Sequence, residues 1–288
     1  MRRSAPVDGF SLAYERSGSG PPVVLLHGWP GDHTDYEDLA PLLVDRAEVV
    51  IPDLRGFGAS DKHPERPADA YSAVAQARSV VGLIAELGLE PPVIAGYDVG
   101  SRIAQAIARD TPEVVRALVV SPPLPGAGER VLTAETGREV WYQAFHQLSL
   151  VEEILDGDPV AVRSYLGHFW RHWSGPAFEP TDARLDHLAE VYGKAGAMSA
   201  SIAWYRAGSG MVASSLAEGD APARITTPTT VLWQSDDPLF PRAWSDRLDR
   251  FFSDVELRPL DGVGHFTPLE APQAFADAID EFLRPRSS

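Results

Sequence analysis

The sequence contains no cysteine, which excludes disulfide bonds, thiolate metal sites and a cysteine nucleophile. Basic residues are also scarce: 25 lysines and arginines stand against 41 aspartates and glutamates, for a net charge of -16 and a pI near 4.8. Because binding to a phosphate backbone needs clustered cations, we expect no nucleic-acid partner. No apolar run is long enough for a signal peptide or a membrane span, so we expect a soluble, cytoplasmic protein without a membrane partner.

What is present suffices for one enzyme-sized core, since 44% of the 288 residues are hydrophobic. Short β-branched runs alternate with helical patterns, and the helical spacing is clearest at residues 72–88 and 272–283. This alternation is typical of α/β proteins with a mostly parallel, doubly wound sheet. The runs that predict strands are residues 23–26, 48–51, 93–95, 117–120, 229–233 and 255–257.

A segment without this alternation interrupts the pattern. Residues 126–222 have the pattern of several helices, so we expect a helical cap inserted into an α/β core made of residues 1–125 and 223–288. The segment is rich in aromatic residues, among them Trp141, Tyr142, Phe145, Trp204 and Tyr205. Two interpretations are open: these rings line an apolar pocket beneath the cap, or they form a small core of the cap itself.

The most informative motif is Gly96-Tyr97-Asp98-Val99-Gly100, which lies between a predicted buried strand and a predicted helix. The two glycines permit a sharp strand-to-helix turn, and such a turn presents its central side chain at the carboxyl edge of the sheet. Asp98 thus stands where a hydrolase of this pattern carries a nucleophilic serine. The alternative is an ordinary surface turn, which the motif alone does not exclude.

A second loop follows the strand at residues 23–26 and reads His27-Gly28-Trp29-Pro30. The backbone amides of Trp29 and Val99 can together form an oxyanion hole, unless the loop is merely a turn. We expect a cis peptide bond before Pro30. The glycine-rich loop at residues 53–61 lacks both the third glycine of a dinucleotide motif and a phosphate-binding lysine, so no nucleotide cofactor is expected.

Two further candidates follow the last predicted strands. His265 comes after the strand at 255–257, and Asp237 is better spaced than Asp236 to follow the strand at 229–233. The order nucleophile, acid, histidine is that of a hydrolytic triad, whereas a lone histidine is usually structural. His168 and His172 lie four residues apart, as metal ligands on a helix can, but no third ligand accompanies them and we expect no metal.

Together these residues resemble the α/β-hydrolase family, and within it the epoxide hydrolases, over essentially the whole chain. The resemblance implies the α/β-hydrolase fold, a mostly parallel doubly wound sheet with an inserted helical cap. The motifs that carry it, in the order and approximate spacing of the family, are His27-Gly28-Trp29-Pro30, Asp53-Leu54-Arg55-Gly56-Phe57-Gly58, the turn around Asp98, Asp237 and Gly264-His265.

The resemblance also implies a mechanism. Asp98 would attack an epoxide to form a hydroxyalkyl ester while Tyr142 and Tyr205 donate hydrogen bonds to the opening ring. His265, oriented by Asp237, would then activate the water that releases a vicinal diol. This chemistry needs water and a small epoxide, expected to be apolar, but no cofactor. The chain is expected to be a monomer or homodimer, with a substrate pocket lined by Trp29, Trp141, Phe145, Trp204 and Phe266.

Dehalogenases use the same aspartate nucleophile and are the alternative. Fluoroacetate dehalogenases have His-Trp in place of Tyr142-Gln143, and haloalkane dehalogenases have Asn in place of Trp29 and Trp in place of Val99. The residues of neither halide site are present. Arg102, however, matches a carboxylate-binding arginine of fluoroacetate dehalogenases, which keeps a haloacetate substrate open.

The chain departs from the family pattern at two places near the site. Tyr97 stands where the family often has histidine, and Ser121 where some relatives have the triad carboxylate, which leaves that role to Asp237.

A third hypothesis, a non-catalytic receptor on the same fold, would have no need of Asp98, His265 and the two cap tyrosines together.

Overall fold

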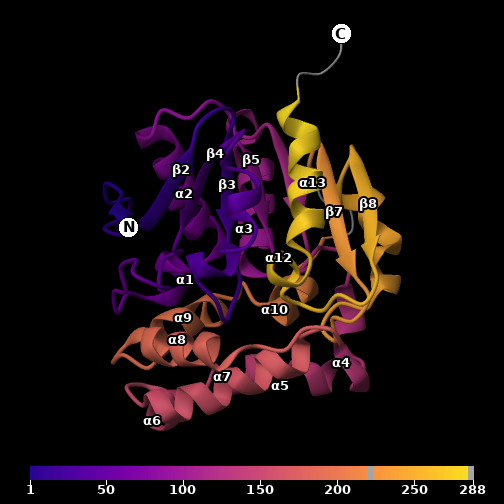
Figure 1. The fold of residues 1–288 in the computed structure, drawn as a ribbon. Coiled ribbons are helices and arrows are strands. Elements are labelled where there is room, and N and C mark those ends of the chain that lie inside the picture. The colour runs from indigo at the N-terminus through magenta and orange to yellow at the C-terminus, as the bar shows by residue number, and fades with distance from the viewer. Residues whose placement is uncertain (220–222, 285–288) are drawn as a thin grey trace.

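An eight-stranded sheet forms the centre of the molecule in the computed structural model, which describes residues 1–219 and 223–284 (Figure 1). Its strand order is β1-β2-β4-β3-β5-β6-β7-β8, and all neighbours are parallel except β1 with β2 and β2 with β4. The predicted fold class is confirmed. The strands are β1 (Arg2–Arg3), β2 (Ala13–Gly18), β3 (Pro22–Leu26), β4 (Glu48–Pro52), β5 (Val93–Gly96), β6 (Ala117–Val120), β7 (Thr229–Gln234) and β8 (Val255–Leu260).

The middle strands are buried on both faces, which explains why they read as continuous apolar runs in the sequence. Every residue of β3, β5 and β6 is buried. The last residues of these three strands are aligned across the sheet, since Leu26 pairs with Gly96 and Gly96 pairs with Val120. The loops that follow these strands therefore leave the sheet side by side at its carboxyl edge, where open α/β sheets bind ligands.

Helices of the core cover the sheet. The side chain of Ser72 accepts a hydrogen bond from the backbone N–H of Ala75 and so caps α2, which runs over Ala73–Glu86, slightly shorter than predicted. The other core helices are α1 (Pro67–Ala70), α3 (Val99–Asp110), α11 (Leu248–Phe251), α12 (Thr267–Glu270) and α13 (Pro272–Leu283), with short 3-10 turns η1 (His33–Tyr36), η2 (Ala40–Leu42), η3 (Pro112–Val114) and η5 (Arg242–Arg247).

The described chain between β6 and β7 contains helices joined by loops, and these helices gather at the end of the sheet to which the arrows of β7 and β8 point (Figure 1). They are η4 (Gly128–Leu132), α4 (Ala134–Glu139), α5 (Trp141–Phe145), α6 (Leu150–Leu155), α7 (Pro159–Trp173), α8 (Asp182–Tyr192), α9 (Ala197–Arg206) and α10 (Met211–Leu216). We refer to α4–α10 as the cap. The predicted boundary between residues 222 and 223 falls at a segment, residues 220–222, that lies outside the described residues.

Polar contacts join the cap to the core loops. The indole N–H of Trp170 on α7 donates to the carbonyl oxygen of Pro30 at 3.0 Å, and the hydroxyl of Tyr192 on α8 donates to the carbonyl oxygen of Gly31 at 2.6 Å. Both acceptors lie in the loop after β3. The cap thus rests on the edge where the strand ends and their loops emerge.

Candidate active site

Asp98 stands at the turn between β5 and α3. Its backbone is strained, with φ 49° and ψ −122°, an uncommon conformation for a residue other than glycine. The turn is possible because its flanks are glycines: a Cβ at Gly100 would overlap the carbonyl oxygen of Leu26, and one at Gly96 would lie 2.7 Å from the carbonyl carbon of Gly100. The geometry presents the Asp98 side chain at the carboxyl edge of the sheet.

The two oxygens of the Asp98 carboxylate have different neighbours. The backbone N–H of Trp29 donates to Oδ1 at 2.7 Å, whereas Oδ2 lies 3.5 Å from Nε2 of His265. Val99 is the first residue of α3, so its amide belongs to a helix N-terminus, where N–H groups have no partner within the helix. The Trp29–Pro30 peptide bond is cis, as expected from the sequence.

His265 lies between two carboxylates in the folded chain. Its Nδ1 is 3.0 Å from Oδ2 of Asp237, and its side chain is fully buried. Burial opposes a charge on the imidazole, but the carboxylates of Asp237 and Asp98 outweigh it and raise the pKa of His265 to about 10. The resting site therefore contains an imidazolium held between two aspartates.

Hydrogen bonds that the sequence did not reveal hold Asp237. The amide of Gln234 donates to its Oδ2 at 2.8 Å, and the backbone N–H of Leu239 donates to Oδ1 at 2.8 Å. The hydroxyl of Ser121 in turn donates to Gln234 Oε1 at 2.9 Å. Ser121 stands where some relatives have a carboxylate. It is connected to Asp237 by two successive hydrogen bonds, through the neutral amide of Gln234.

Glu270 is the residue near the site that sequence reasoning missed. Its half-buried carboxylate accepts the backbone N–H groups of Gly264 at 2.7 Å, Gly175 at 2.9 Å and Phe266 at 3.1 Å. Two of these donors flank His265, so Glu270 holds the histidine loop against the end of α7. No local motif marks this role, because one donor lies 95 positions away in the chain.

Tyr142 on α5 and Tyr205 on α9 approach the site from the cap. Their rings lie 5.6 Å apart, and both side chains are buried beside Asp98. Burial, and then the negative charge of Asp98, raise the pKa of Tyr142 well above its ordinary value, and burial likewise raises the pKa of Tyr205. Both are therefore neutral phenols that can donate hydrogen bonds.

A small cavity of about 10 Å³ separates these tyrosines from Asp98. Of the five predicted pocket residues, Trp204 is among its lining residues. Trp141 and Phe145 are not among them. The full lining is Asp98, Val99, Arg102, Pro123, Tyr142, Gln143, Trp204, Tyr205, Ser209, Met211, Leu239 and Phe240.

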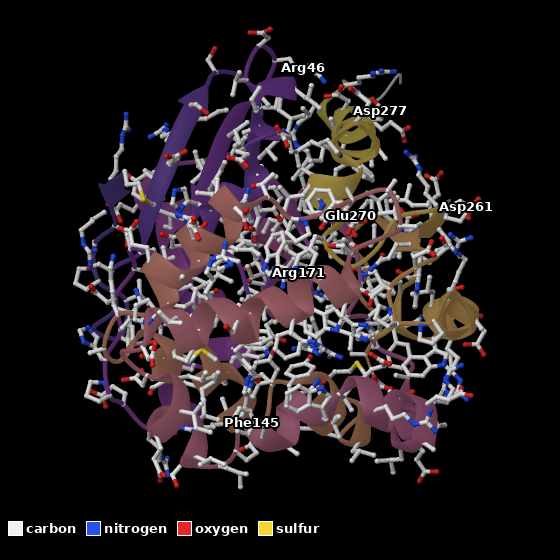
Figure 2. All side chains as sticks on the ribbon, turned by 60° about the horizontal axis from the view of Figure 1, so that its bottom comes forward. Arg46, Phe145, Arg171, Asp261, Glu270 and Asp277 are labelled. Atoms are coloured by element: carbon white, nitrogen blue, oxygen red, sulfur yellow. The ribbon has the colours of Figure 1, made fainter. Side chains whose placement is uncertain are left out.

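Trp141 and Phe145 lie on a different face of α5 from Tyr142. They lie at i and i+4 and share one face of α5, with their rings 6.1 Å apart, whereas Tyr142 points from another face into the site. Trp141 is 43% exposed. Figure 2 shows Phe145 on the cap and Glu270 against the C-terminal core elements.

The rings of Trp29 and Phe266 are buried and are not among the residues that line this small cavity. The Trp29 indole stacks behind Tyr142 at 5.5 Å, and Phe266 stacks on Trp170 at 3.9 Å. Both rings pack between the cap and the core. The part of Trp29 that reaches Asp98 is its backbone N–H.

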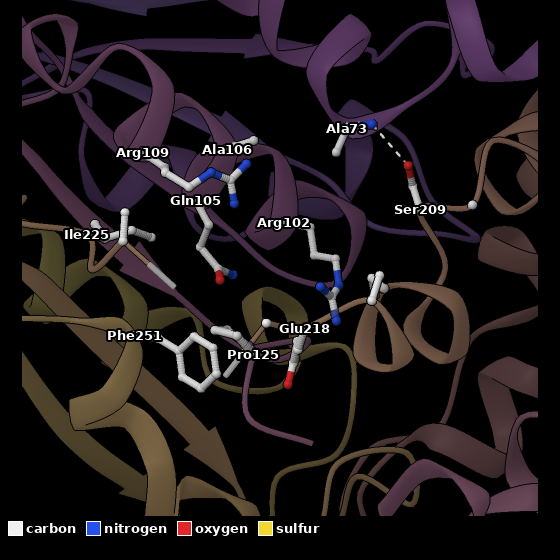
Figure 3. A pocket seen from close by; sticks show the side chains of 15 residues that line it. Ala73, Arg102, Gln105, Ala106, Arg109, Pro125, Ser209, Glu218, Ile225 and Phe251 are labelled. Atoms are coloured by element: carbon white, nitrogen blue, oxygen red, sulfur yellow. Dashed lines mark hydrogen bonds between the residues drawn. The ribbon is translucent and has the colours of Figure 1, made fainter. Parts of the chain in front are cut away.

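A larger cavity of about 430 Å³ lies next to the small one and shares Arg102 and Ser209 with it (Figure 3). Nε and Nη2 of Arg102 are buried, without a hydrogen-bond partner among the described residues. Burial lowers the pKa of Arg102 to about 10, against the opposing charges of Glu218 and Asp98, so the guanidinium stays charged at neutral pH. The lining also includes Gln105, Arg109 and Glu218, which makes this cavity partly polar.

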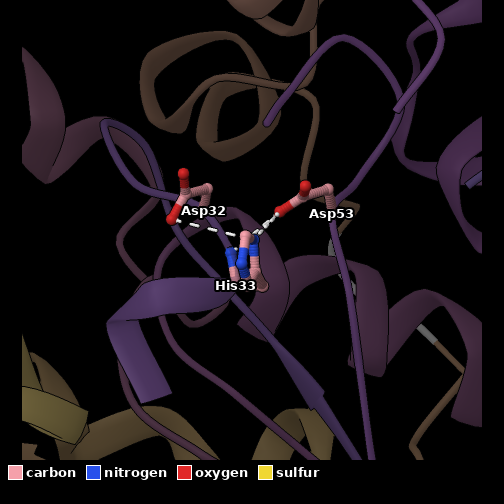
Figure 4. A group of neighbouring side chains, drawn as sticks. All are labelled: Asp32, His33 and Asp53. Atoms are coloured by element: carbon pink, nitrogen blue, oxygen red, sulfur yellow. Dashed lines mark hydrogen bonds and ion pairs between the residues drawn. The ribbon is translucent and has the colours of Figure 1, made fainter. Parts of the chain in front are cut away.

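Asp32, His33 and Asp53 form a compact group that resembles a metal site in composition (Figure 4). Nδ1 of His33 lies 2.8 Å from Oδ1 of Asp53. Burial opposes its charge, but Asp53 outweighs this effect and raises the pKa of His33 to about 9. The imidazole of His33 thus joins the carboxylates of Asp53 and Asp32, which lie 2.8 and 4.0 Å from its Nδ1.

The predicted helical pair His168 and His172 stacks ring on ring at 5.7 Å on α7, and Nε2 of His172 lies 2.6 Å from a carboxylate oxygen of Glu139. These groups lie on the outer side of the cap and do not line the cavity with Asp98.

In the described ranges 1–219 and 223–284, no helix combines the length and the apolar character needed to cross a bilayer.

Comparison with known proteins agrees with the observed fold. The family model described as alpha/beta hydrolase fold matches residues 21–272. The soluble epoxide hydrolase of Corynebacterium sp. (strain C12) is 26% identical, over 98% of this chain and 96% of its own. The fluoroacetate dehalogenase of Burkholderia sp. is 30% identical, over 98% of this chain and 93% of its own. A solved structure of a candidate epoxide hydrolase from Klebsiella pneumoniae subsp. pneumoniae has a TM-score of 0.83 and 26% sequence identity. The match covers 99% of this chain and 97% of that chain.

Proposed function

The chain belongs to the alpha/beta hydrolase fold family, and from this premise we propose that it is an epoxide hydrolase whose Asp98 carboxylate attacks the substrate. One observation carries the proposal: Asp98 and the phenols of Tyr142 and Tyr205 line the same small cavity. A carboxylate needs no base to act as a nucleophile. Two neutral O–H donors opposite it suit a leaving group that is a basic oxygen and stays attached to the substrate.

In the first step, one oxygen of Asp98 forms a bond to a ring carbon of the epoxide as the C–O bond of the ring breaks. Oδ2 is the better nucleophile, because Oδ1 already accepts the N–H of Trp29. The electron pair of the broken bond moves to the ring oxygen, which takes a proton from Tyr142 or Tyr205. The product is a hydroxyalkyl ester of Asp98.

In the second step, water attacks the ester carbonyl and His265 takes its proton. Negative charge then develops on the oxygen that faces the N–H groups of Trp29 and Val99, which are the proposed oxyanion hole. When this intermediate collapses, the bond between the carbonyl carbon and the alkyl oxygen breaks, and the leaving alkoxide takes the proton from His265 to give a vicinal diol. The carboxyl group of Asp98 then returns a proton to His265, which restores the carboxylate and the imidazolium.

The charges in the site fit this order of events. In the resting enzyme, Asp98 and Asp237 together raise the pKa of His265 against its burial. Formation of the ester removes the negative charge of Asp98, so the pKa of His265 falls and the imidazolium can lose its proton. That proton restores, by way of solvent, the phenol that gave its own to the ring oxygen. The histidine thereby becomes a base at the moment when the ester is ready to be hydrolysed.

Single-turnover reaction in ¹⁸O-labelled water tests the proposal. With enzyme in excess over styrene oxide, the first diol released should carry no label, because its new oxygen comes from the Asp98 carboxylate. In later turnovers label should appear, once the carboxylate has exchanged its oxygen with water. Labelled diol in the first turnover would mean that water attacks the epoxide directly and would refute the ester mechanism.

Arg102 favours one second candidate, a dehalogenase acting on haloacetates. Its unpartnered buried nitrogens lie at the cavity that also contains Asp98, where a small substrate carboxylate can bind. The similarity to the Burkholderia fluoroacetate dehalogenase points the same way. Incubation with fluoroacetate and measurement of released fluoride separates the two activities, because an epoxide hydrolase releases none.

A further inference from the structure

Two buried polar side chains that the proposed reaction does not use meet beneath the turn at Asp98. The hydroxyl of Tyr97 donates to Oδ2 of Asp35 at 2.6 Å, and both residues are completely buried. Tyr97 directly precedes Asp98 in the chain. Asp35 belongs to η1, the short helix that follows the loop of Trp29. The bond therefore links the two chain segments that carry the amides of the proposed oxyanion hole.

The close packing around this bond leaves little room for movement. A Cβ at Gly28 would lie 2.8 Å from the ring of Tyr97 and 2.7 Å from the Cβ of Asp98, and one at Gly31 would overlap the Asp35 carboxylate. Both glycines belong to the loop after β3. The loop thus lies directly on the Tyr97–Asp35 pair, and a change in the pair would shift the loop relative to Asp98.

We propose that Asp35 and Tyr97 are a positioning pair that sets the Asp98 carboxylate against the N–H of Trp29 and against His265. The pair touches no substrate and acts through the two backbones that it joins. The effect of the pair on reaction rate rests on the proposed epoxide hydrolase function. The effect of the pair on the distance between Asp98 and His265 does not depend on that function.

The energetic balance of Asp35 supports a role beyond stability. Oδ1 of Asp35 is buried without a hydrogen-bond partner in the described part of the chain, and Nη1 of Arg184 on α8 is 3.6 Å away. A carboxyl group in such a place is costly to bury, and an apolar pair of similar volume would avoid that cost. The polar pair provides what an apolar pair cannot, a directional bond of defined length.

The cap reaches the same pair. Arg184 lies near Asp35, donates to the hydroxyl of Thr34 at 2.7 Å and forms an ion pair with Glu37. These three partners lie within η1 or directly after it. His187, one turn later on α8, contacts Asp32 at 2.7 Å. The position of α8 is thus linked to the turn at Asp98 through η1 and the hydroxyl of Tyr97.

Four variants test the pair. Tyr97→Phe removes the donor, Asp35→Ala removes the acceptor, and Asp35→Asn keeps an acceptor oxygen at the same place. Tyr71→Phe is the matched control, because Tyr71 is an equally buried tyrosine whose hydroxyl donates to the carbonyl oxygen of His63 at 2.6 Å, away from Asp98. Melting temperatures show which variants keep the fold.

The first readout is the rate of ester formation on Asp98 with styrene oxide, followed by rapid quench. We expect Tyr97→Phe and Asp35→Ala to slow it roughly 10- to 100-fold with KM within about twofold, as a small misplacement of reacting groups does. We expect Asp35→Asn to stay within about threefold of the parent and Tyr71→Phe to match it. Parent rates in both Tyr97→Phe and Asp35→Ala would overturn the proposal.

The second readout needs no substrate. Tyr97→Phe removes no charge, so a fall in the pKa of His265, followed by NMR titration of its ring, would report that Asp98 has moved away from it. Tyr71→Phe should leave that titration unchanged. If the parent forms no ester, the epoxide hydrolase proposal fails while the titration still decides the pair. An unchanged titration in Tyr97→Phe would refute the positioning role.

Discussion

Nε2 of His265 lies 3.5 Å from Oδ2 of Asp98, so the proposed base and the proposed nucleophile form an ion pair before any substrate is bound. This contact separates the two steps in time. While Asp98 is charged it stabilises the protonated imidazole, and once Asp98 is esterified that stabilisation is lost. The contact therefore predicts that His265 matters for the second step and little for the first.

Replacement of His265 by alanine should stop the reaction at the ester. Asp98 should still react once with styrene oxide, so intact-protein mass spectrometry should find the chain heavier by one substrate molecule. The double variant Asp98→Asn/His265→Ala is the control and should gain no mass. Continued diol production by His265→Ala would remove His265 from the proposed role.

The cap tyrosines should govern the first step. Loss of one donor to a developing oxyanion typically costs about 3 to 4 kcal/mol, or roughly two to three powers of ten in rate. We expect Tyr142→Phe and Tyr205→Phe each to slow ester formation, less if the remaining tyrosine compensates, and the double variant to lose it almost entirely. Rapid quench measures this step directly.

Tyr165→Phe is the matched control for these variants. Tyr165 is also a cap tyrosine, but its hydroxyl lies 2.9 Å from Nε2 of His146 and it does not line the cavity with Asp98. Its loss should leave ester formation at the parent rate. If the double variant of Tyr142 and Tyr205 also reacted at the parent rate, dehalogenation with Arg102 as the carboxylate contact would become the better hypothesis.

Glu270 should matter for the second step alone, because it holds the His265 loop and does not touch Asp98. Glu270→Gln leaves one acceptor oxygen for three N–H donors, and an unsatisfied buried donor costs about 1 to 3 kcal/mol. We expect a lower melting temperature and accumulation of the ester during turnover. Glu256→Gln, at an exposed ion pair with Arg258 on β8, is the control and should change neither. A slower first step in Glu270→Gln would contradict this assignment.

Stability should depend on pH through Asp35. Burial raises the pKa of this carboxyl from 3.8 to about 7, against the opposing charge of Arg184 and with further effects of Asp32, Tyr97 and His187. The folded state thus holds a proton that the unfolded chain releases near pH 4. The stability from this group is complete below pH 4 and is lost as the pH rises through about 7.

Asp35→Asn should remove this part of the pH dependence. Between pH 4 and pH 8, we expect the free energy of unfolding of the parent to fall by roughly 1 to 4 kcal/mol more than that of the variant. Urea unfolding at several pH values measures the difference, and the other titrating groups cancel because both proteins contain them. Parallel pH profiles would show that Asp35 is not protonated in the folded state.

The sequence by itself determined the fold class and which loops would meet. Strands buried on both faces must be apolar throughout, and glycines must flank a turn as tight as the one at Asp98, so both features leave local patterns. The order of Asp98, Asp237 and His265, each after its own strand, then predicts that they share the carboxyl edge of a parallel sheet. The structure places all three there.

Only the tertiary structure decided which side chains face the cavity and what holds them. The sequence did not reveal the antiparallel strand β2. Nor did it reveal that Trp141 and Phe145 share one face of α5 and do not line the cavity with Asp98, because an aromatic residue in a short helix is apolar whichever face it occupies. Glu270 and the Tyr97–Asp35 pair bind partners far away in the chain. A hydrogen bond between distant segments leaves no local periodicity, since its partners become neighbours only when the chain folds.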